Sequence, residues 1–111
     1  MERVLGTITN VTVNHNDKDK LYALLHIETS DSFCDYLFYI TNGAHMYQLS
    51  ALMERLRVDW IYELINNPII ICIENNMIHG LGSSDGIIYL PPKPLLNKKR
   101  DCKKTSTFIN L

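Results

Sequence analysis

Hydrophobic and polar residues alternate over the first forty residues with the period of two that is typical of half-buried strands. The apolar face holds Leu21, Ala23, Leu25 and Ile27 in residues 21–29, and Cys34, Tyr36, Phe38 and Ile40 in residues 33–40. Residues 4–13, rich in Val, Ile and Thr, predict an earlier strand with Gly6 as a candidate bulge. Because short polar segments separate these stretches, we expect a three-stranded antiparallel meander.

The period changes after the strand break at Thr41-Asn42-Gly43. Apolar residues then recur at helical spacing and predict a helix over residues 45–57, with a stripe formed by Leu49, Leu52, Met53 and Leu56. Asp59 is a suitable N-cap for a second, short helix over residues 60–65. Asn66-Asn67-Pro68 ends that segment.

The second half of the chain returns to strand patterns. Residues 69–73 are almost continuously apolar and predict a central strand that is covered on both faces. Asn75-Asn76 predicts a two-residue hairpin turn, because Asn tolerates the positive φ of a type I′ turn. A returning strand over 77–81, a loop over 82–86 and a last apolar segment at 87–90 follow. The expected fold is α+β, an antiparallel sheet of about five strands in the order β-β-β-α-α-β-β, with the helices on one face.

A chain of 111 residues fits a single domain. Three prolines within residues 91–94 cannot continue a helix or a strand ladder, so we place the end of the globular domain at residue 92. Residues 93–111 are expected to form a basic, flexible C-terminal tail, and a docked strand over residues 107–111 is the alternative.

Charge divides the chain into an acidic body and a basic tail. Residues 1–92 hold five basic and eleven acidic residues, a formal charge of −6, whereas residues 93–111 hold six basic residues and one acidic one, +5. The carboxylates predicted to face a basic partner are Asp31, Asp35, Glu54, Asp59 and Glu63. The tail cations predicted to contact a partner or nucleic-acid phosphates are Lys98, Lys99, Arg100, Lys103 and Lys104.

Candidate catalytic chemistry is sparse. The four histidines lack metal-site spacing, although His26 and His79 could meet across the sheet. Cys34 and Cys72 lie in strands and are interpreted as structural, and Cys102 as an exposed thiol with adventitious reactivity. An odd number of cysteines without a CxxC pair indicates a reducing compartment. No apolar run reaches the roughly 20 residues of a membrane helix. We therefore expect an intracellular protein that is not an enzyme and uses no metal or cofactor.

The stretch from residue 43 to residue 82 carries a family resemblance. Its helical leucines lead into Val58-Asp59-Trp60 and Glu63-Leu64, followed by an isoleucine-rich strand, Asn75-Asn76 and Ile78-His79-Gly80-Leu81-Gly82. This outline resembles small uncharacterised accessory proteins of phages and prophages. The likeness spans about residues 4–90, and the basic tail is not part of it.

The resemblance implies a setting in the cytoplasm of a host cell and action by binding. Phage proteins of this kind often bind and block host enzymes, including CRISPR effectors and other defence proteins. We therefore expect a phage-encoded, non-enzymatic inhibitor of anti-CRISPR or other anti-defence type whose acidic body contacts a host protein. The alternative is a phage accessory protein that binds nucleic acid through its basic tail. A homodimer formed through an exposed sheet edge is a further possibility.

Overall fold

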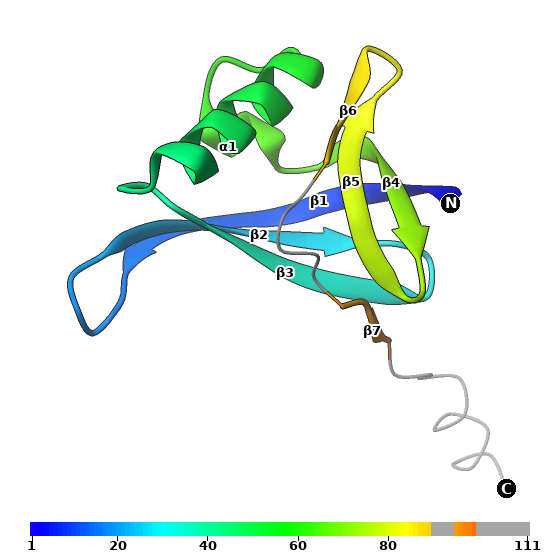
Figure 1. Ribbon diagram of the computed structural model, residues 1–111, viewed down its shortest axis with the longest axis horizontal. Helices are drawn as coiled ribbons and strands as arrows, with labels where there is room; N and C mark the ends of the chain where they lie inside the picture. The colour runs from blue at the N-terminus through cyan, green and yellow to red at the C-terminus, as the bar shows by residue number, and fades with distance from the viewer. Residues whose placement is uncertain (90–94, 100–111) are drawn as a thin grey trace, which may run out of the picture.

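The computed structural model describes residues 1–89 and 95–99 of the chain (Figure 1). Within them, one antiparallel sheet of seven strands is accompanied by one α-helix and one short 3₁₀ turn. The coarse α+β class is therefore confirmed. The elements are β1 (Glu2–His15), β2 (Leu21–Glu28), β3 (Ser32–Tyr39), α1 (Gly43–Arg55), η1 (Ile61–Leu64), β4 (Asn67–Glu74), β5 (Met77–Ser83), β6 (Gly86–Tyr89) and β7 (Asn97–Lys98).

The long strand β1 organises the sheet, whose strand order is β6-β5-β4-β1-β2-β3-β7. Its first half pairs with β4 and its second half with β2, and Thr7 is paired with a residue on each side. The ladder with β2 shifts register between Ile8 and Asn10, so the bulge lies there and not at Gly6. Bulges increase strand twist. In Figure 1 the β1–β2–β3 and β4–β5–β6 parts of the sheet accordingly run across one another.

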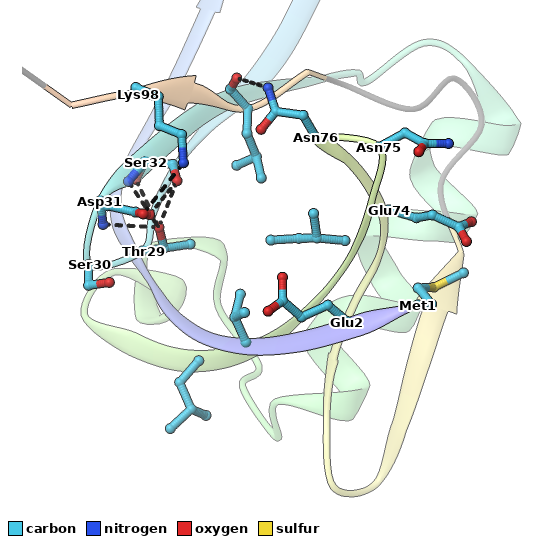
Figure 2. A pocket seen from close by; sticks show the side chains of 14 residues that line it. Met1, Glu2, Thr29, Ser30, Asp31, Ser32, Glu74, Asn75, Asn76 and Lys98 are labelled. Carbon is cyan, nitrogen blue, oxygen red and sulfur yellow. Dashed lines mark hydrogen bonds and ion pairs between the residues drawn. The ribbon is translucent and has the colours of Figure 1, made fainter.

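Residues 95–99 run from β5 to β3 and so bring the two halves of the curled sheet together. β7 pairs antiparallel with the start of β3, and Leu95 forms an isolated bridge with Met77 at the start of β5. The strands thus surround a common core in a barrel-like ring, seen from its open end in Figure 2. Near the other end, α1 contacts β3, β5 and β6 and buries Leu49 and Leu52 in the core.

Several expectations about the strands are confirmed. Alternate residues of β2 and β3 are buried as predicted, although Leu21 is 45% exposed. The turn residues Asn75 and Asn76 have φ values of 54° and 60°, as a type I′ turn requires. β4 lies between β1 and β5, inside the sheet.

The expected second helix is wrong. Residues Ile61–Leu64 form a single 3₁₀ turn, and Trp60, not Asp59, precedes it without any side-chain capping bond. Four residues are too few to nucleate an α-helix, and tertiary contacts set their conformation instead. The first helix begins at Gly43 because the Asn42 side chain accepts a hydrogen bond from the His45 amide at 3.1 Å. With one α-helix among the described residues, the order β-β-β-α-α-β-β does not hold.

The sheet also has more strands than the expected five or so. The last apolar segment pairs with β5 as β6, and Asn97–Lys98 pairs with β3 as β7. Residues 95–99 fall in the segment expected to be a flexible tail, yet Leu96 is only 6% exposed. A short polar strand has no alternation from which to predict it. The alternative docked strand over residues 107–111 lies outside the described residues.

Candidate functional site

Two large aromatic side chains are exposed on the loop that follows α1. Trp60 is 66% exposed and Tyr62 is 46% exposed, while Leu64 in the same loop is fully buried. Large aromatic residues normally bury most of their surface in the core. A loop that buries its leucine and leaves its tryptophan in solvent therefore presents a candidate contact surface. We call Trp60 and Tyr62 the aromatic loop pair.

Hydrogen bonds hold the backbone of this loop along its length. Beyond α1, the amides of Arg57 and Val58 bond back to the carbonyls of Glu54 and Met53, at 3.1 and 3.0 Å. The Glu63 amide bonds to the Trp60 carbonyl at 2.9 Å. The Asn67 side chain donates to the Glu63 carbonyl at 3.1 Å. The backbone that carries the aromatic loop pair is thus held in place before any partner arrives, which lowers the entropy cost of binding.

The β5–β6 turn supports the start of the same loop. Arg57 Nε donates to Asp85 Oδ2 at 2.9 Å, and Ser83 Oγ donates to the Arg55 carbonyl at 2.7 Å. Arg57 itself has a φ of 58°, a left-handed conformation that turns the chain sharply after the helix. These contacts join the loop to the sheet as well as to α1.

Three of the five predicted acidic contact residues lie in this region. Glu54 is near the end of α1, and Asp59 and Glu63 flank the aromatic loop pair in sequence; all three are exposed. None of the three forms an ion pair with any other described residue. These carboxylates are therefore available to a cationic partner.

The other two predicted carboxylates lie elsewhere and are already engaged. Asp31 lies in the turn between β2 and β3, at the side of the molecule away from α1 (Figure 1). The Ser32 hydroxyl and the Lys98 ammonium hold the pKa of Asp31 below its ordinary value. Asp35 lies on the outer face of β3 and contacts His26. The five carboxylates thus do not form one face.

His26 is enclosed by acceptors on the outer face of β2. Its Nδ1 lies 2.5 Å from Asp35 Oδ1, its Nε2 lies 3.4 Å from Glu28 Oε2, and its ring stacks on Phe33. A general base needs a ring nitrogen that can accept the substrate's proton. With both nitrogens facing carboxylates, His26 fits a role in joining strands better than one in catalysis.

The structure does not bring His26 and His79 together. His79 lies in β5, where its Nε2 is 3.2 Å from the Glu74 carbonyl, and β4 and β1 separate that strand from β2. Within the described residues, no three His, Cys, Asp or Glu side chains are grouped closely enough to hold a metal ion.

The cysteines fit the structural interpretation. Cys34 and Cys72 are both free and buried. Burial, with a smaller effect of the Asp35 charge, raises the pKa of the Cys34 thiol to about 11, so the reactive thiolate is disfavoured. Cys102 lies outside the described residues.

The first tail cations are bound to the body. Lys98 Nζ lies 3.5 Å from Asp31 Oδ2, and Lys99 Nζ lies 2.8 Å from Glu28 Oε1. The bond from Lys99, followed by one from Thr9, lowers the pKa of Glu28. Two of the five predicted tail cations are therefore partly neutralised. Arg100, Lys103 and Lys104 lie outside the described residues.

Sequence reasoning missed a second group of aromatic side chains. Tyr22, Phe33 and Tyr39 alternate with the buried residues of β2 and β3, so they lie with His26 on the outer face of the barrel. Tyr22 pairs directly with Tyr39 across the ladder. The sequence contained a signal for this group, because the three aromatic residues occupy the positions that alternate with the apolar face of each strand.

The open end of the barrel holds a cavity of about 550 Å³. Figure 2 shows the Glu2 carboxylate pointing into this opening and Glu74 pointing away from it. The wall opposite Glu2 carries Asp31, Ser32 and Lys98, joined by hydrogen bonds and an ion pair. Leu96 lines the cavity as well.

In the described part of the chain, no helix is long and apolar enough to cross a membrane. Comparison with protein-family models, with curated proteins and with solved structures found no match to this chain. The likeness to phage accessory proteins therefore stays a prediction from the sequence.

Proposed function

We propose that this protein is a non-enzymatic binding protein that attaches to a basic host protein and blocks it, as phage inhibitors of CRISPR effectors and other defence proteins do. The observation that carries the proposal is the aromatic loop pair, exposed on a hydrogen-bonded loop, together with three carboxylates that form no ion pair with another described residue. Binding hot spots are enriched in Trp and Tyr. Surrounding carboxylates would steer a cationic surface toward them.

The test is capture of a partner from host lysate with matched variants. Trp60→Ala removes the more exposed aromatic side chain, and Leu21→Ala removes an apolar side chain that is 45% exposed at the start of β2. We expect Trp60→Ala to weaken the captured complex by about 2 kcal/mol, roughly thirtyfold in Kd. Leu21→Ala should leave binding unchanged.

Salt dependence adds a second criterion. The association rate should fall as salt rises, and replacing Glu54, Asp59 and Glu63 with their amides should remove most of that fall. A partner held equally well by the wild type and by Trp60→Ala, with a salt-independent rate, would contradict the proposal. So would the absence of any stoichiometric partner.

A second candidate function, binding of single-stranded nucleic acid, is supported by the outer face of the barrel. The barrel-like ring, although it has seven strands, is similar in outline to the five-stranded, partly open barrels that bind oligonucleotides on the face of strands 2 and 3. A shared fold does not assign a function. The aromatic residues Tyr22, Phe33 and Tyr39 on this face supply the specific support, because bases stack on such rings.

Fluorescence anisotropy with a labelled oligothymidylate at low salt tests this candidate. Tyr39→Leu should weaken binding by about 1–3 kcal/mol if a base stacks there, whereas Tyr47→Ala on α1 should not. Deleting residues 100–111 keeps β7 and removes three of the five tail cations, so it tests the tail separately. Absence of binding at low salt would exclude this candidate.

A further inference from the structure

Residues 95–99, which we call the strap, occupy the gap between β3 and β5. At one end, the Leu96 amide donates to the Asn76 carbonyl at 2.9 Å and the Asn76 side chain donates to the Leu96 carbonyl at 3.1 Å. The Leu96 side chain belongs to the hydrophobic core, whereas Leu95 is 63% exposed. The strap therefore has one apolar anchor.

The other end of the strap is held by charge and by strand pairing. Asn97 and Lys98 pair with Phe33 and Ser32. The Lys99 amide donates to the Asp31 carbonyl at 2.8 Å, and Lys99 Nζ donates to the Thr29 carbonyl at 2.7 Å. Together with the two ion pairs to Asp31 and Glu28, these contacts hold an extended segment in which an apolar residue is followed, after one intervening residue, by two cations.

The strap uses only a small part of the available edge. β3 extends from Ser32 to Tyr39, but its strand pairs with the strap involve only Ser32 and Phe33. Beyond Phe33 this edge pairs with no other described strand, but its far end is occupied, because the Tyr39 amide donates to His45 Nδ1 at 2.9 Å and the Tyr39 carbonyl accepts from the Asn42 amide at 3.1 Å. An incoming strand that continued along β3 would form backbone hydrogen bonds that the strap does not form.

We propose that the edge of β3, with Glu28 and Asp31, is a recognition site for an extended basic segment of a partner protein, and that the strap covers it as an internal copy of that segment. A segment antiparallel to β3 would place its apolar residue opposite Cys34, facing the core. Its two following cations would reach Asp31 on the inner side and Glu28 on the outer side, because side chains alternate along a strand.

The edge of β3 would bind an extended basic segment, which is a different kind of contact from the one expected at the aromatic loop pair. It assigns a contact to Asp31 and Glu28, which lie away from α1, and it needs no residue of the loop after that helix. The two proposals can therefore fail separately. A designed peptide tests the strap site, and capture from lysate tests the loop.

The probe is the labelled peptide Thr-Val-Thr-Leu-Asn-Lys-Lys, whose last four residues copy residues 96–99 and whose first three can extend along β3 as far as Leu37, short of the engaged Tyr39 backbone. Its affinity for the full-length protein is measured by fluorescence anisotropy. Because a covered site lowers apparent affinity by the closed fraction, loosening the strap should strengthen binding. Leu96→Ala removes the anchor, and Leu95→Ala is the matched control with an exposed side chain.

We expect Leu96→Ala to bind the peptide about tenfold more tightly than the wild type, and Leu95→Ala to bind as the wild type does. Lys99→Gln loosens the strap without touching the core and should give a smaller gain, which covers the case that Leu96→Ala fails to fold. A peptide ending in Gln-Gln instead of Lys-Lys should bind about tenfold more weakly. Hydrogen exchange should slow in residues 35–37 when the basic peptide is bound.

Three results would overturn the proposal. The first is equal peptide affinity for the wild type, Leu96→Ala and Lys99→Gln. The second is equal binding of the Lys-Lys and Gln-Gln peptides. The third is dimerisation of the loosened variants without peptide binding, because the edge would then accept only the strap of a second copy.

Discussion

Replacing Gly6 in β1 with alanine should destabilise the fold, whereas the same replacement of Gly43 in α1 should not. Gly6 lies in the part of β1 that leads into the residues paired with both β2 and β4. A Cβ built there would lie 2.7 Å from the Glu28 carbonyl oxygen and would also collide with the Ile71 side chain. Ile71 can change rotamer, but the carbonyl belongs to a ladder and can yield only if β2 shifts.

The expected cost follows from that backbone contact. Overpacking in a well-packed interior costs about 1–3 kcal/mol, and a contact with backbone belongs in the upper half of that range. We therefore expect Gly6→Ala to lower the free energy of unfolding by about 2 kcal/mol, which corresponds to roughly 8 °C in Tm for a domain of this size. Urea denaturation at 25 °C and calorimetry measure both quantities.

Gly43→Ala is the matched control, because nothing lies within 4 Å of a Cβ at that position. Gly43 is the first residue of α1, where alanine is at least as favourable as glycine. We expect a change within about 0.5 kcal/mol, neutral or stabilising. Equal stabilities of the two variants would refute the inference that β1 needs a glycine for close approach of β2.

Three further predictions concern the turn, the thiols and the strap. Asn75→Ala should destabilise the hairpin by about 1 kcal/mol and Asn75→Gly should not, because the φ of 54° disfavours alanine; urea melts compare them. Cys34 should resist thiol reagents at pH 8 until the protein is unfolded, because its folded pKa is about 11. Since that pKa is raised from 9.0, its contribution to stability should be lost as pH rises from about 9 toward 11, which urea melts across that range measure. The lowered pKa values of Glu28 and Asp31 predict that the strap is docked at neutral pH and released as pH falls below about 4, seen as loss of protection of the Leu96 amide.

Local patterns predicted the strands well where one face of a strand is buried. The apolar positions of β2 and β3, such as Leu25 and Phe38, are in the core because alternation reports burial directly. The turn at Asn75-Asn76 was predictable from φ preferences alone. Both features depend on neighbouring residues only.

The elements that sequence reasoning missed depend on distant contacts. The loop after α1 had a plausible cap at Asp59, but the burial of Leu64 and the bond from the Asn66 amide to the Ile8 carbonyl select a 3₁₀ turn instead. β7 has no hydrophobic pattern, because its strand partner is the edge of β3. The five predicted carboxylates do not form one site, because their positions also depend on distant contacts. Glu54, Asp59 and Glu63 are close in sequence, whereas the strap engages Asp31 from more than sixty residues away.

If the edge of β3 binds a basic segment of a partner, release of the strap couples that binding to contact of the tail with nucleic acid. While the strap is docked, Lys98 and Lys99 neutralise carboxylates of the body. If a partner's basic segment replaces it, both lysines lose these carboxylate partners and can contact phosphates. By reciprocity, whatever favours one of these binding events through strap release must favour the other by the same factor. If the strap proposal holds, docking of Lys98 and Lys99 on the acidic body and their contact with phosphates are two alternative states of one equilibrium.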